Sequence, residues 1–162
     1  MNSTDDQSTE YFDLRANGLG YLNRYRVVSP REGRRHSEYI AVTIGALQGP
    51  KDSVSTVYLD AKVCGAEAKE LLKKYQVDIN DKSTKVMVVF NVEGITPEIY
   101  TLSQGKSAGE TRVSIKTRLL WLTSIRIKRK GEDSYKLVYQ QEKQPTATDQ
   151  SSEESGGDSA GE

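Results

Sequence analysis

Positive side chains alternate with small and apolar ones in the stretch TRVSIKTR, residues 111–118. One parity consists of Val113, Ile115 and Thr117. The other parity carries the cations and consists of Arg112, Ser114, Lys116 and Arg118. A period of two is typical of a half-buried strand. We therefore expect a strand with one basic face, which either binds the phosphates of a polyanion or serves as a solvated edge that discourages aggregation.

Arginines cluster in a second stretch, NRYRVVSPREGRRH, residues 23–36. The planar guanidinium forms paired hydrogen bonds with phosphate and stacks on bases, so arginine is well suited to nucleic acid. The alternative is a soluble surface turn. The predicted phosphate contacts from this stretch, from the basic strand and from the loop before it are Arg24, Arg26, Arg34, Arg35, Lys106, Arg112, Lys116 and Arg118.

Tyrosine dominates the aromatic residues, with nine Tyr against two Phe and one Trp. Half-exposed tyrosines stack on bases while the hydroxyl stays in water. The predicted stacking residues are Tyr21, Tyr25, Tyr58 and Tyr100. Tyr58 lies on the outward parity of its segment, and Tyr21 and Tyr25 share one parity of theirs. The alternative role is packing against a helix or a neighbouring protomer, and we expect half of such rings to pack in this way.

Charge is distributed unevenly along the 162 residues, although the formal net charge is zero. Residues 1–10 carry three acids and residues 144–162 carry five, and neither segment contains a cation. All 23 lysines and arginines thus lie within 11–143 beside the remaining 15 acids, which gives that segment a charge of +8. We expect a basic domain over 11–143 that meets polyanions. Disordered segments are expected at 1–10 and 144–162, the second being an acidic tail that competes with DNA.

Strand signals surround one helical signal in the middle of the chain. The expected elements are strands at 19–28, 38–47, 54–63 and 84–92, a helix at 65–76, a long hairpin at 98–127 and a short strand at 134–140. Three strands, a helix and two further strands are the order of the OB-fold, a five-stranded barrel that binds oligonucleotides on an open face. A sandwich would need about seven short strands. The sequence thus predicts a mainly β OB-fold barrel with a long late hairpin.

Several classes of chemistry find no support in the sequence. One cysteine, Cys64, and one histidine, His36, are too few for a disulfide or a zinc site. We find no constellation of acids and histidine that would make an enzyme, and we expect no metal or other cofactor. No apolar run reaches the roughly 18 residues of a membrane helix, and the first residues are polar, so we expect a cytoplasmic protein without membrane contact.

Several blocks resemble a bacterial family of replication proteins carried on integrative and conjugative elements. The blocks are YFDL (11–14), GLGYLNRYRVV (18–28), VCGAEA (63–68) and GKSAGETRVSIKTRLLWL (105–122), and the resemblance covers about residues 11–139. Separately, KVCGAEAKELLKKY resembles bacterial single-stranded DNA-binding proteins. That resemblance implies that Tyr58 stands where those proteins place a stacking aromatic residue, and that Cys64 stands where they place another.

Two hypotheses of different classes follow. In the first, the chain is a non-catalytic OB-fold protein that binds single-stranded DNA during replication or transfer of a mobile element, and forms homo-oligomers. In the second, it is a structural or interaction module that holds replication or conjugation proteins together. The apolar parity of RLLWLTSIRI (118–127), including Trp121, would then supply an oligomer contact.

Overall fold

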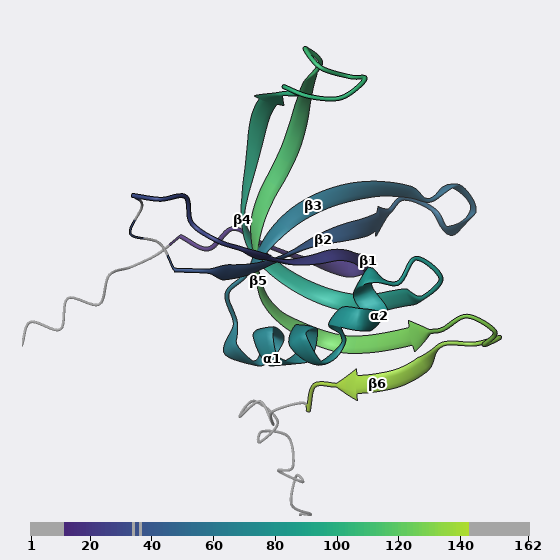
Figure 1. Cartoon of the computed structure of the whole chain (residues 1–162). Helices are drawn as coiled ribbons and strands as arrows, with labels where there is room; N and C mark the ends of the chain where they lie inside the picture. The colour runs from purple at the N-terminus through teal and green to yellow at the C-terminus, as the bar shows by residue number, and fades with distance from the viewer. Residues whose placement is uncertain (1–11, 34, 36, 143–162) are drawn as a thin grey trace, which may run out of the picture.

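The computed structural model describes residues 12–33, 35 and 37–142, and the elements below belong to these residues. They are β1 (Arg15–Val28), β2 (Tyr39–Gln48), the 3-10 turn η1 (Lys51–Ser53), β3 (Ser55–Val63), α1 (Ala66–Lys74), α2 (Gln76–Asn80), β4 (Lys85–Thr101), β5 (Thr111–Lys128) and β6 (Lys136–Gln140) (Figure 1). The mainly β fold class predicted from the sequence is confirmed. The segments predicted to be disordered, 1–10 and 144–162, lie outside the described residues.

The first five strands close into a barrel. Four antiparallel pairs, β1–β2, β2–β3, β1–β4 and β4–β5, are completed by a parallel pair between β3 and β5. β6 pairs with residues 124–127 of β5 and lies outside the barrel. This strand order, with the helical segment between the third and fourth strands, is that of the OB-fold. The parallel pair matters for the site, because it sets Asp60 opposite Lys116 and Lys62 opposite Arg118.

The barrel interior is filled by the inward parity of the strands. The outward parity predicted for Tyr58 is confirmed, because Leu59, Ala61 and Val63 on the opposite parity of β3 are buried while Tyr58 is exposed. The segment 118–127 also turns its apolar side chains inward, and its buried members are Leu119, Leu122, Ile125 and Ile127. Trp121 is half-buried, with the Arg15 guanidinium 5.7 Å from its ring centre. Most of the apolar surface that was a candidate oligomer contact is therefore core, which corrects that part of the second hypothesis.

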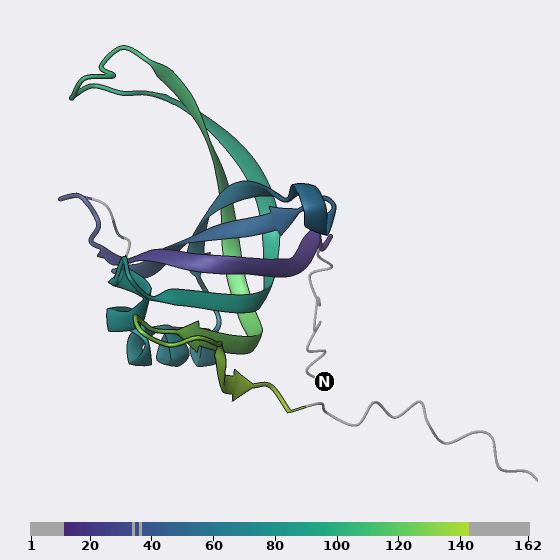
Figure 2. The same ribbon diagram turned by 90° about the vertical axis from the view of Figure 1, so that its right-hand side faces the viewer.

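The helix predicted at 65–76 is α1, and a second short helix, α2, follows it from Gln76 and was not predicted. They lie below the barrel, at the end away from the projecting parts of β4 and β5 (Figures 1 and 2). Ala68, Leu72 and Ile79 are buried against the barrel core. Gly65 sits where the chain leaves β3. A Cβ there would lie 1.9 Å from the carbonyl oxygen of Leu120, so the close approach of the two segments requires glycine.

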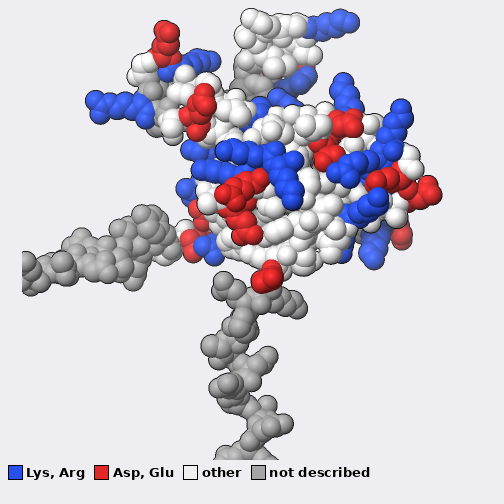
Figure 3. Space-filling model, turned by 60° about the horizontal axis from the view of Figure 1, so that its bottom comes forward, with Lys and Arg blue, Asp and Glu red and all other residues white. Residues whose placement is uncertain are grey.

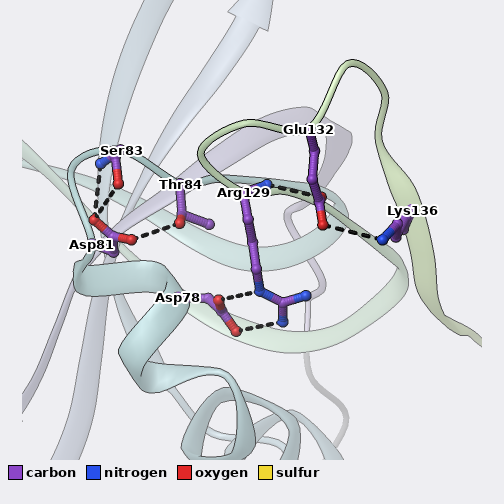
Figure 4. Close-up of polar contacts among 7 residues, drawn as sticks. All are labelled: Asp78, Asp81, Ser83, Thr84, Arg129, Glu132 and Lys136. Carbon is purple, nitrogen blue, oxygen red and sulfur yellow. Dashed lines mark hydrogen bonds and ion pairs between the residues drawn. The ribbon is translucent and has the colours of Figure 1, made fainter.

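Polar contacts attach the β5–β6 connection to α2 (Figure 4). The Arg129 guanidinium donates two hydrogen bonds to the Asp78 carboxylate, at 2.9 and 3.1 Å. Glu132 accepts a hydrogen bond from the backbone N–H of Arg129 and forms an ion pair with Lys136. The backbone hydrogen bond, followed by the bond from Lys136, holds the pKa of Glu132 below its ordinary value. These contacts fix the lower end of the barrel, far along β5 from the basic strand residues.

The distal parts of β4 and β5 leave the barrel as a two-stranded arm, residues 95–101 and 111–114, which projects into solvent (Figures 1 and 2). β1 pairs with β4 only as far as Glu93, and β3 pairs with β5 only from Ile115 onward. Gly94 marks the departure point, with a φ of +65° that favours glycine. The strand predicted at 84–92 thus continues past a bulge to Thr101.

The described residues form two α-helices, of nine and five residues. Among them, no helix is both long enough and apolar enough to cross a bilayer. The same residues contain no group of three or more histidine, cysteine, aspartate or glutamate side chains placed to hold a metal ion.

Candidate nucleic-acid interface

The face of the barrel beside the base of the arm carries two adjoining hollows, which together we call the groove. The first, of about 610 Å³, is lined by charged and aromatic side chains that include Arg26, Tyr39, Asp60, Lys62, Lys116 and Arg118. The second, of about 400 Å³, is lined by residues that include Arg24, Arg26, Tyr58, Asp60, Tyr100 and Lys116. Three side chains, Arg26, Asp60 and Lys116, line both hollows and form the seam between them.

A β-bulge in β1 presents Arg24 to the groove. The register with β2 shifts between Asn23 and Arg26, and Arg24 has a φ of 51°, which is uncommon for a residue other than glycine. The side chain of Asn80 holds the bulge from α2. It accepts a hydrogen bond from the backbone N–H of Tyr25 at 2.9 Å and donates one to the Tyr25 carbonyl oxygen at 3.1 Å. The backbone N–H and carbonyl of Tyr25, which the bulge removes from the strand pairing, thereby gain hydrogen-bond partners.

The same bulge separates two predicted stacking residues. Because one extra residue reverses the alternation, Tyr21 and Tyr25 do not share a face, which corrects the parity assigned from the sequence. Tyr25 turns into the core, where it is 9% exposed. Tyr21 is half-buried, with its hydroxyl 3.5 Å from the hydroxyl of Tyr135. Neither ring is among the groove residues.

Tyr58 and Tyr100 do reach the groove, from different strands. Tyr58 extends from β3 and is 65% exposed, and Tyr100 extends from the arm and is 40% exposed. Both line the second hollow, together with Arg24. Two accessible rings beside an arginine offer stacking platforms for bases. Cys64, the second stacking position implied by the resemblance to single-stranded DNA-binding proteins, is exposed but is not among the groove residues.

Acidic side chains accompany the cations of the groove. Asp60 accepts a 2.6 Å hydrogen bond from Arg26 and a second bond from Lys116, one on each carboxylate oxygen. Partial burial by itself would raise the pKa of Asp60, but these two cations outweigh it and hold the pKa below its ordinary value. Arg118 forms an ion pair with Glu93 at 2.8 Å. On the face shown in Figure 3, basic and acidic side chains likewise lie next to one another.

The other predicted phosphate contacts lie around the groove or beyond it. Arg112 stands opposite Tyr100 in the arm and forms an ion pair with Glu110 at 3.4 Å. Lys106 is exposed in the loop at the tip of the arm, and Arg35 is exposed in the connection between β1 and β2. Arg34 lies outside the described residues. Of the twelve predicted site residues, the groove brings together Arg24, Arg26, Tyr58, Tyr100, Lys116 and Arg118.

Several groove residues were not predicted as site residues, and Tyr39, Asp60 and Lys62 are among them. The Lys62 ammonium lies 4.9 Å from the ring centre of Tyr39, within the range of a cation–π contact. A signal for each was present, because Tyr39 lies on the outward parity of 38–47, and Asp60 and Lys62 share the outward parity of Tyr58. Their nearness to the basic strand was not readable, since it depends on the parallel pair between β3 and β5.

Comparison with known proteins places the chain in a family without supplying a function. No curated protein matches it. No solved structure matches it either. A family model described as "Protein of unknown function (DUF3577)" matches residues 5–146, which is most of the chain and includes every strand of the barrel. The chain therefore belongs to the DUF3577 family.

Proposed function

We propose that this protein binds single-stranded DNA in the groove, without catalysis, during replication or transfer of a bacterial mobile genetic element in the cytoplasm. The groove carries the proposal, because it places two exposed tyrosines between arginine and lysine side chains on an OB-fold barrel. OB-folds use such a face for oligonucleotides. The link to integrative and conjugative elements rests on the resemblance of the sequence blocks described above.

The layout of the groove fits a single strand better than a duplex. Tyr58 on β3 and Tyr100 on the arm are available to unstacked bases, whereas bases in a duplex present only their edges. Stacking tolerates any sequence, so we propose binding without sequence preference. Within the described residues, no ion pair involves Arg24 or Lys62, which makes these two cations the first expected phosphate contacts.

Assembly and partners belong to the same proposal. One groove is a short path for a strand, and several copies of the chain side by side would lengthen it. We therefore propose a homo-oligomer, with replication or conjugation proteins as further partners.

Charge reversal inside the groove tests the proposal. The variant Arg24→Glu/Arg118→Glu changes one side chain in each hollow, and both side chains are exposed. Its matched control, Lys69→Glu/Arg126→Glu, makes the same charge change at exposed positions on α1 and on lower β5. We expect the groove variant to lose at least tenfold in affinity for a labelled thymine oligonucleotide, measured by fluorescence anisotropy, and the control to lose much less. Equal losses would place the DNA elsewhere.

A second candidate function, an interaction module, is favoured by the apolar face of the arm, whose residue Val113 also lines the second hollow. Ile99 and Val113 are paired across the two strands and are 73% and 64% exposed. Exposed apolar side chains that are paired on a projecting two-stranded arm are typical of a protein–protein interaction site. Ile99→Lys/Val113→Lys should dissociate assemblies in sedimentation velocity if this face joins protomers. Unchanged sedimentation together with loss of DNA binding would assign the arm to DNA instead.

A further inference from the structure

Asp60 occupies an unusual position for an acid in a surface that would bind a polyanion. It lies in the middle of β3 at the seam of the groove and lines both hollows. Its two carboxylate oxygens are divided between two cations, with Arg26 on one and Lys116 on the other. The three residues come from β1, β3 and β5, so the contact is built by the barrel and not by one local turn.

A carboxylate held by two cations has the same contacts that a phosphate would take in that place. Charge-assisted bonds to carboxylate and to phosphate have similar geometry, and a cation engaged with one is less available to the other. The side chain of Asp60 is 22% exposed, so solvent screens these contacts only in part. A DNA strand crossing the seam must either exchange with Asp60 for Arg26 and Lys116 or pass over a cluster whose charge is already partly cancelled.

We propose that Asp60 is an internal competitor of the DNA backbone, which positions Arg26 and Lys116 at the seam while limiting the affinity of the groove. This inference rests on the proposed function and specifies how the site is regulated from within. Two consequences follow. Removal of the Asp60 charge should tighten DNA binding, and it should steepen the dependence of affinity on salt, because two more cations become available to phosphates.

The variant Asp60→Asn keeps the size of the side chain and removes its charge. Each phosphate neutralised on a single strand adds about 0.7 to the slope of log affinity against log salt, so release of one or two cations should steepen the slope by about 0.7 to 1.4. At low salt we expect the dissociation constant for a thymine oligonucleotide to fall by roughly tenfold, since one negative charge near the bound phosphates is gone.

Asp78→Asn is a matched control. Asp78 forms a comparable ion pair, with Arg129 at 2.9 Å, and its side chain is 19% exposed. It lies on α2 and is not among the groove residues (Figure 4). Both variants raise the net charge by one, so any general electrostatic effect is common to both. We expect Asp78→Asn to leave the salt slope unchanged and the affinity within about twofold.

Neutralisation of single cations in the wild-type background tests the inference even if Asp60→Asn does not fold. If the ion pair with Asp60 keeps Lys116 from binding phosphate, Lys116→Gln should weaken DNA binding by less than about threefold. Arg24→Gln should weaken DNA binding by about fivefold or more. In the Asp60→Asn background, Lys116→Gln should instead remove about 0.7 from the salt slope. An effect of Lys116→Gln as large as that of Arg24→Gln would overturn the inference.

The outcomes separate the inference from the function on which it rests. A wild-type protein that does not bind the oligonucleotide at low salt contradicts both. A wild-type protein that binds, combined with a folded Asp60→Asn variant of equal or lower affinity and an unchanged slope, contradicts the inference alone. Circular dichroism and thermal unfolding of each variant establish that it is folded.

Discussion

Replacement of Tyr58 by alanine should separate DNA binding from folding. The ring is 65% exposed and lies over its cross-strand partner Gly45, with one ring carbon 3.5 Å from where a Cβ on that glycine would sit. Little packing is lost on truncation, so the free energy of unfolding should fall by less than about 1 kcal/mol. A base stacked on the ring is worth roughly 1–3 kcal/mol. A central value of about 2 kcal/mol corresponds to about 30-fold in the dissociation constant.

Anisotropy titrations with a thymine oligonucleotide measure this loss, and urea unfolding measures the stability. Tyr58→Phe is the matched control, because it keeps the ring and should bind within about twofold of the wild type. Tyr100→Ala should behave like Tyr58→Ala, and the double variant should show the sum of the two losses if each ring stacks a different base. Tyr25→Ala should do the opposite and lower stability by several kcal/mol, because that ring is core. The reasoning is refuted if Tyr58→Ala binds within twofold of the wild type.

Three further predictions concern the framework of the groove. Asn80→Ala leaves the N–H and carbonyl of Tyr25 without their side-chain partner, and urea unfolding should show a loss of about 1–3 kcal/mol; an unchanged stability would mean that water replaces the amide. Gly65→Ala brings a methyl group into the Leu120 carbonyl oxygen, so the melting temperature should fall by several degrees, and an unchanged value would contradict the close approach. The pKa of Asp60 is lower in the folded protein than its ordinary value of 3.8. The ionised carboxylate therefore stabilises the fold above pH 3.8, and this stabilisation is lost as the pH falls through the lower pKa of the folded state. The difference in stability between wild type and Asp60→Asn should thus narrow below about pH 4, and a difference that stays constant to pH 2 would argue against the ion pairs.

The order of strands and helix along the chain could be predicted from the sequence because each barrel strand has a recognisable strand pattern. Burial of alternate residues in β3 follows directly from the period-two pattern of 54–63. The helical period between the third and fourth strands then favours an OB-fold over a sandwich. The exposure of Tyr58 follows from the same pattern, so part of the candidate site was also accessible to sequence reasoning.

Other features depend on contacts between distant segments and left no local signal. The bulge that turns Tyr25 inward is held by Asn80, which lies 55 residues further along the chain. The partner of Lys116 is Asp60, which reaches it only through the parallel pairing of β3 with β5. The alternation in 111–118 predicts Val113 as an inward residue, yet Val113 is 64% exposed because the strand has left the barrel at that point. Local periodicity gives the face of a residue only where the strand has no bulge, and tertiary pairing decides what that face meets.

The most direct measurement is an anisotropy titration of the wild-type protein against a labelled thymine oligonucleotide of a few tens of bases, at low and at moderate salt. A duplex of the same length serves as competitor. The account predicts tight binding that weakens steeply as salt increases and that the duplex does not displace. Absence of binding at low salt, or equal displacement by the duplex, would contradict the claim that the groove is a site for single-stranded DNA.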